Sequence, residues 1–141
     1  MNTADDVRDH QARCGPHLAR LWMLAVGEAG APLADGVAGQ VTNATSAILA
    51  EVKAAERAAL APAADGRTAG TQPLLAARLT RLEHAADDAV ASARDGNAVT
   101  LRDQLRRFGT LTSAMWTVQL SACDEATARA RPGGQSSAGA S

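Results

Sequence analysis

Residues 33–61 read LADGVAGQVTNATSAILAEVKAAERAALA. Apolar side chains recur in this segment in alternating steps of four and three residues, a spacing that places them on one face of an α-helix. Alanine, the strongest helix former, fills many of the other positions. The pattern predicts a helix over residues 33–61 that buries this stripe: Val37, Val41, Ala44, Ile48, Val52, Ala55 and Ala59.

Two later segments have the same helical periodicity. The first begins near Thr71, a suitable N-cap followed by Pro73, and ends at Asp95-Gly96-Asn97, where glycine suits a left-handed residue. The second is expected to begin with a capping box formed by Thr100 and Asp103. The stripes expected to be buried are Leu75, Leu79, Leu82, Ala86 and Ala89 or Val90 in the first, and Leu101, Leu105, Phe108, Leu111, Met115, Val118 and Ala122 in the second.

Residues 4–28 also have an apolar face, but Gly15-Pro16 lies inside the segment. Proline lacks a backbone donor and clashes with the preceding turn of a helix. We therefore expect a short leading helix to about Cys14 and a second helical start at Pro16, where the missing N–H costs little.

Together these segments predict an all-α, antiparallel, up-down-up-down four-helix bundle, with the first helix interrupted at Gly15-Pro16. The prediction is a single domain over residues 1–130 and a disordered tail over 131–141, which is rich in Gly and Ser. A three-helix body with a separate N-terminal helix is the alternative that the sequence leaves open.

The composition fits this architecture and limits the partners. Alanine supplies about a quarter of the 141 residues, and there is one Phe, no Tyr and two Trp. The net charge of −1 makes nucleic acid an unfavoured partner. Because no apolar run is long enough to span a membrane and the N-terminus lacks a signal sequence, we expect a cytoplasmic protein that does not engage a membrane. Lys53 is the one lysine, a bias typical of GC-rich bacterial genomes such as those of actinobacteria.

Three pairs of rare residues suggest a register between the first and last helices. In an antiparallel pair, Trp22 would face Trp116, Met23 would face Met115 and Cys14 would face Cys123, because their residue numbers have nearly the same sum. The sequence therefore predicts these contacts.

The candidate metal site combines His10, Cys14, His17 and, across the predicted register, Cys123. Spacings of four and three place the first three on one helical face, and imidazole with thiolate suits Zn or Cu. The alternatives are buried cysteines that act as small apolar residues, or a Cys14–Cys123 disulfide. No other cofactor is predicted.

The sequence contains no motif for serine catalysis, a phosphate loop or a di-iron centre. We therefore predict a non-enzymatic bundle with an interaction or regulatory role, whose partner is another protein or a second copy in a homodimer. Trp22 and Trp116 are the candidate interface residues, with burial in the core as their alternative. The last helix also carries a face of small polar residues that could form a dimer seam: Thr110, Ser113, Thr117 and Ser121. The alternative function is metal or small-ligand binding at the His/Cys site.

Overall fold

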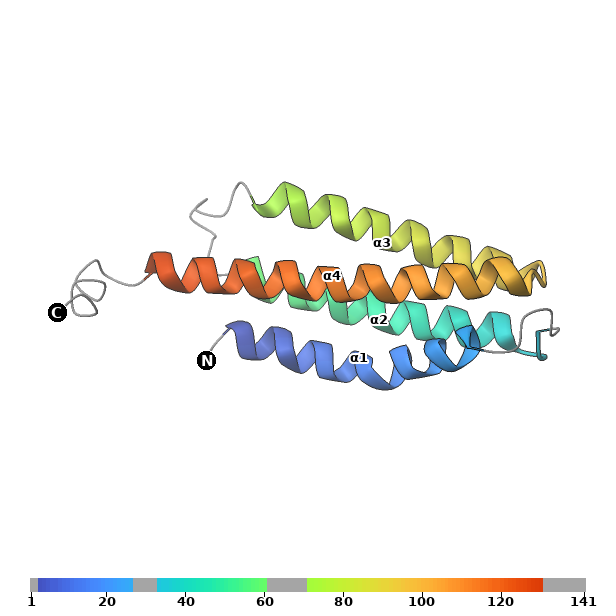
Figure 1. Ribbon diagram of the computed structural model, residues 1–141. Helices are drawn as coiled ribbons and strands as arrows, with labels where there is room; N and C mark the ends of the chain where they lie inside the picture. The colour runs from blue at the N-terminus through green and yellow to red at the C-terminus, as the bar shows by residue number, and fades with distance from the viewer. Residues whose placement is uncertain (1–2, 27–32, 61–70, 131–141) are drawn as a thin grey trace.

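A computed structural model of the chain describes residues 3–26, 33–60 and 71–130, which form four α-helices (Figure 1). The helices are α1 (Thr3–Ala25), α2 (Val37–Leu60), α3 (Thr71–Arg94) and α4 (Ala98–Ala130). Each helix runs in the opposite direction to the one before it, so the chain passes along the bundle four times (Figure 1). The predicted all-α four-helix bundle is confirmed.

The four helices do not surround the core equally. Each helix packs against its neighbour along the chain, and α1 also packs against α4. The helices α2 and α4 contact each other as well, so they occupy the short diagonal of the bundle. Large side chains fill the core, among them the fully buried Ile48 of α2 and Phe108 of α4.

The apolar stripe of α2 is buried throughout, as its spacing predicts. The helix begins at Val37, however, four residues later than expected. Gly36 adopts a positive φ of 81°, and the Val37 N–H donates to the carbonyl of Ala34 at 3.3 Å, so a turn precedes the helix. On α3 and α4 the expected stripes also face the core, with partly exposed members at Leu79, Val90, Leu111 and Val118.

A tight connection joins α3 to α4 through three residues. Gly96 has a φ of 73°, and the N–H groups of Gly96 and Asn97 donate to the carbonyls of Ala93 and Ser92. This is the Schellman arrangement that closes a helix. Asn97 then begins α4, because its Oδ1 accepts a hydrogen bond from the Thr100 N–H at 3.2 Å. The predicted capping box at Thr100 is therefore wrong, and Asn97 is the N-cap.

The predicted break in the first helix is also wrong. The helix α1 continues through Pro16 and bends near its middle (Figure 1). Proline removes one backbone donor, but buried side chains on both sides of it, including Cys14 and Leu21, keep both halves of α1 packed into the core. Packing therefore outweighs the local cost of the proline.

Polar side chains are also buried in the bundle. Thr45 and Thr112 are buried, and each hydroxyl donates to the carbonyl four residues earlier in its own helix at 2.8 Å. Gln119 is fully buried and its Nε2 donates to the carbonyl of Val52 at 3.1 Å. This hydrogen bond links α4 to α2 through the centre of the bundle.

No helix in the described part of the chain combines the length and the apolar character that crossing a membrane requires. The predicted tail over 131–141 lies outside the described residues.

Candidate functional site

His10 is part of a polar contact between α1 and α2. Its Nδ1 lies 2.5 Å from Oε2 of Glu51, and the Arg13 guanidinium lies 3.2 Å from the same ring nitrogen. Arg13 is also 3.8 Å from Glu51. The imidazole is therefore directed to the carboxylate of α2, and this contact ties the N-terminal half of α1 to the middle of α2.

The two cysteines are buried separately and both are free thiols. The Cys14 Sγ lies 4.0 Å from the carbonyl of Ile48, and burial, with a further contribution from Glu51, raises its pKa from 9.0 to about 12. Burial also raises the pKa of Cys123, although a hydrogen bond with Thr3 opposes the shift. A metal is bound by the thiolate, whereas burial favours the neutral thiol at both Cys14 and Cys123.

The four predicted ligands are not brought together. His17 lies at a shallow hollow between α1 and α2, beside Arg20 and Gln40, whereas His10 contacts Glu51. Among residues 3–26, 33–60 and 71–130, no group of three or more His, Cys, Asp or Glu side chains is arranged to hold a metal ion.

The register between α1 and α4 differs from the predicted one. The Arg106 guanidinium donates to the carbonyl of Ala25 at 3.2 Å, and Trp22 lines the same groove as Gly109. The residue opposite Trp22 is therefore about seven positions before Trp116, a displacement on the order of 10 Å along the helix axis. The predicted Trp, Met and Cys pairs do not form in this register. The nearly equal sums of their residue numbers are a coincidence and carry no information about how the side chains pack.

The two tryptophans occupy contrasting environments. Trp116 is 3% exposed and belongs to the core, whereas Trp22 is 61% exposed. Met23, next to Trp22, is 73% exposed, and Val26 and Val99 are also exposed. Since α1 ends where α4 begins, these side chains lie at one end of the bundle (Figure 1). Burial in the core is the correct prediction for Trp116, and Trp22 is the tryptophan available to a partner.

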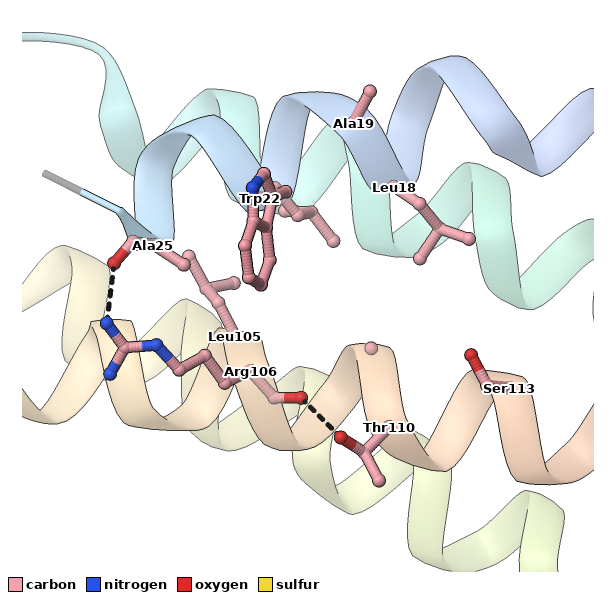
Figure 2. Close-up of a pocket in the computed structure, with 10 residues that line it drawn as sticks. Leu18, Ala19, Trp22, Ala25, Leu105, Arg106, Thr110 and Ser113 are labelled. Atoms are coloured by element: carbon pink, nitrogen blue, oxygen red, sulfur yellow. Dashed lines mark hydrogen bonds between the residues drawn. The ribbon is translucent and has the colours of Figure 1, made fainter.

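Trp22 forms a wall of an open groove between α1 and α4, which we call the α1–α4 groove (Figure 2). Its volume is about 440 Å³, within the range of roughly 300–1,000 Å³ that is common for ligand sites. The lining is mainly apolar: Leu18, Ala19, Leu21, Trp22 and Ala25 from α1, and Leu105, Arg106, Gly109, Thr110 and Ser113 from α4.

Two residues of α4 shape the groove. Gly109 has no side chain, and a Cβ built there would meet no atom within 4 Å, so the space above it is open. Arg106 spans the end of the groove, where its Nη2 donates to the carbonyl of Ala25 (Figure 2). Its Nη1 lies 3.3 Å from Oδ1 of Asp103. The α1–α4 groove is therefore apolar and has one cation, Arg106, at its end.

Sequence reasoning named Trp22, Thr110 and Ser113 but did not find the groove. The signal that could have found it is a glycine in the interior of a long helix, because glycine there lowers helix stability and leaves space beside the backbone. Gly109 has that position in α4.

The groove contains no arrangement typical of catalysis. Arg106 is the one titratable side chain among its lining residues, and it is held by Ala25 and Asp103. The Thr110 hydroxyl donates to the carbonyl of Arg106 at 3.1 Å, within its own helix, and no general base lines the groove beside it.

The groove can therefore accept apolar side chains beside one cation, Arg106, that already has partners within the chain. Comparison with known proteins adds no relative: no protein-family model matches the chain, and neither a curated protein nor a solved structure shows significant similarity to it.

Proposed function

We propose that this protein is a non-enzymatic interaction module that binds a partner through the α1–α4 groove. The observation that carries the proposal is the exposure of Trp22 on the wall of an apolar groove. Tryptophan is enriched among the residues that contribute most to protein–protein affinity, and such residues cluster around pockets. Leaving this indole in water is unfavourable, and a partner that covers it removes that cost.

The size of the groove suits side chains of a partner. A cavity of about 150 Å³ is enough to hold a benzene ring, so a groove of about 440 Å³ accommodates more than one large apolar side chain. The partner would therefore gain its contacts from the apolar lining of the groove and from the exposed indole of Trp22.

A small apolar ligand is the second candidate, favoured by the volume and by the apolar lining. Small-molecule sites usually bury about 70–90% of the ligand. The α1–α4 groove is open to solvent, so a small molecule would keep much of its surface in water. A protein partner covers the open side as well, which makes it the better-supported occupant.

The test uses a neutral apolar dye such as Nile red and two matched glycine variants. Gly109→Leu puts a side chain into the groove, and Gly39→Leu puts the same side chain at an open position of α2 that does not line the groove. We expect dye binding to be lost in Gly109→Leu and in Trp22→Ser but kept in Gly39→Leu. Equal dye binding by wild type and Gly109→Leu would refute an accessible apolar groove.

Self-association is the form of the proposal that needs no second protein. Static light scattering over a range of protein concentrations, compared between wild type and Trp22→Ser, separates this case from binding to another protein. A mass that rises with concentration in wild type alone indicates that a second copy occupies the groove.

A further inference from the structure

A polar hollow lies between α1 and α2, and we call it the α1–α2 hollow. Its volume is about 260 Å³, and four polar side chains line it beside Pro16 and Ala44: His17 and Arg20 from α1, and Gln40 and Asn43 from α2. His17 and Gln40 are half-buried and Arg20 is exposed, so a ligand can reach the hollow from solvent. The hollow shares no lining residue with the α1–α4 groove, and its role is independent of the proposed function.

Helix geometry explains why these polar side chains meet. Each helix contributes two of them at a spacing of three residues, which places both on one face of that helix. The contact between His10 and Glu51 gives the antiparallel register of α1 on α2. His17 follows His10 by seven residues. Asn43 precedes Glu51 by eight residues, so at about 1.5 Å per residue both helices reach the hollow about 10–12 Å from that contact.

The polar groups of the α1–α2 hollow have no partners within the protein. In the part of the chain that the structure describes, none of the four side chains forms a hydrogen bond or an ion pair with another residue. No carboxylate lines the hollow, and Glu51, a carboxylate of α2 that contacts α1, is already held by His10 and Arg13. The donors of Arg20 are therefore available to a ligand.

The donors in the hollow suit a phosphate group. The guanidinium of Arg20 presents a fork of N–H groups that binds phosphate or carboxylate through two parallel hydrogen bonds. The amides of Gln40 and Asn43 and the imidazole of His17 supply further donors. A carboxylate offers two oxygens to these four side chains, whereas a phosphate monoester offers three outer oxygens and a larger charge. Phosphate therefore satisfies more of the donors.

A second hollow adjoins the first and has a more apolar lining. The two share Pro16, Arg20 and Gln40, and the remaining lining residues of the second are Ala19, Met23 and Leu24. Its volume of about 480 Å³ is within the range common for small-molecule sites. Met23 is mostly exposed, so an apolar group that covers it would remove apolar surface from water.

We infer that the two hollows between α1 and α2 bind a small phosphate monoester with an apolar organic group. The phosphate lies in the α1–α2 hollow, and the organic group lies against Met23 and Leu24 in the adjoining one. Arg20 lines both hollows and binds the phosphate where they meet. The lining runs from Pro16 to Leu24, about 12 Å along α1, which matches the length of a small molecule.

The probe is phenyl phosphate, titrated at constant pH and ionic strength and followed by the side-chain amide resonances of Gln40 and Asn43 in NMR spectra. Inorganic phosphate tests the α1–α2 hollow alone, and benzoate offers a carboxylate on the same ring. We expect saturable shifts with all three ligands, and phenyl phosphate should bind at least about threefold more tightly than either of the others.

Two variants separate the parts of the site. Arg20→Gln should weaken phenyl phosphate and inorganic phosphate alike, by about tenfold, because charge-assisted hydrogen bonds are lost. Met23→Ser should weaken phenyl phosphate by about threefold and leave inorganic phosphate unchanged. Arg57→Gln, at an exposed position of α2, is the control for the loss of one positive charge and should change neither affinity.

Other outcomes overturn the inference in distinguishable ways. Shifts that do not saturate, or equal affinities in Arg20→Gln and Arg57→Gln, would mean that phosphate makes only non-specific ionic contacts. Benzoate binding as tightly as phenyl phosphate would remove the preference for phosphate, and inorganic phosphate doing so would remove the apolar hollow from the site. Binding should be unchanged in Gly109→Leu, whereas its loss there would place the phenyl ring in the α1–α4 groove.

Discussion

The Arg106 guanidinium donates a hydrogen bond of 3.2 Å to the carbonyl of Ala25, the last residue of α1 (Figure 2). The last four carbonyls of a helix have no partner within the helix, and a cation near them also interacts favourably with the helix dipole. This contact therefore gives a partner to a carbonyl at the end of α1 and closes one end of the groove.

Replacing Arg106 with Met should lower the thermal midpoint by about 3–5 °C, because a hydrogen bond from a charged donor to a partly buried carbonyl contributes on the order of 1 kcal/mol. A thermal melt followed by circular dichroism measures the change. Asp103→Ala is the matched control, since it removes the exposed ion pair of Arg106 and leaves the bond to Ala25 in place. Equal shifts in both variants would show that the Ala25 contact has no special role.

The glycines of the chain should respond to alanine with opposite signs. Gly109 is helical and has open space where a Cβ would stand, so Gly109→Ala should stabilise the protein by about 0.5–1 kcal/mol. Gly96 has a φ of 73° in the α3–α4 connection, so Gly96→Ala should destabilise it by about 1 kcal/mol or more. Urea unfolding at constant m-value measures the change in the free energy of unfolding for each variant. A loss of stability in Gly109→Ala would mean that the groove is less open than described.

The fold could be predicted from sequence where apolar residues recur with the period of an α-helix. Every member of the α2 stripe from Val37 to Ala59 is buried, since steps of four and three residues leave one face for the core. Boundaries were less predictable, because they depend on single hydrogen bonds. Asn97 and Thr100 are both acceptable caps by residue type, and the position of the α3 C-terminus decides in favour of Asn97.

The candidate site was harder to predict from sequence, because it depends on the register between α1 and α4 and on the absence of a side chain at Gly109. The matching positions of Trp22 and Trp116 carry no steric information, and the true register follows from how side chains of α1 and α4 interlock over their whole length. Gly109 adds open space to the groove because it has no side chain, which the periodicity of apolar residues does not report.

Adding Zn, Cu(I) or a chelator should leave the thermal midpoint unchanged, because His10, Cys14, His17 and Cys123 are not arranged around a common point. A metal present at 100 times its dissociation constant would add about 2.7 kcal/mol, which shifts the midpoint by several degrees. The melt is repeated with Cys14→Ser. A metal-dependent increase that disappears in this variant would restore the predicted metal site.

The Cys14 thiol should make the protein less stable at alkaline pH. Its pKa is about 12 in the folded protein, against 9.0 as its ordinary value, because burial disfavours the thiolate. Between these values the unfolded chain loses the proton while the folded chain keeps it, so the free energy of unfolding falls as pH rises from about 9 to 12. The slope from this one group is at most about 1.4 kcal/mol per pH unit.

The measurement is the difference between the urea midpoints of wild type and Cys14→Ala over pH 8–11, in which the titration of all other groups cancels. Cys14→Ala is expected to be less stable near pH 8, because the smaller side chain leaves space beside Ile48, and to lose less stability as pH rises. The two curves should therefore converge with increasing pH. Parallel curves would mean that the thiol ionises with nearly the same pKa in both states, and that Cys14 is more accessible to water than its full burial indicates.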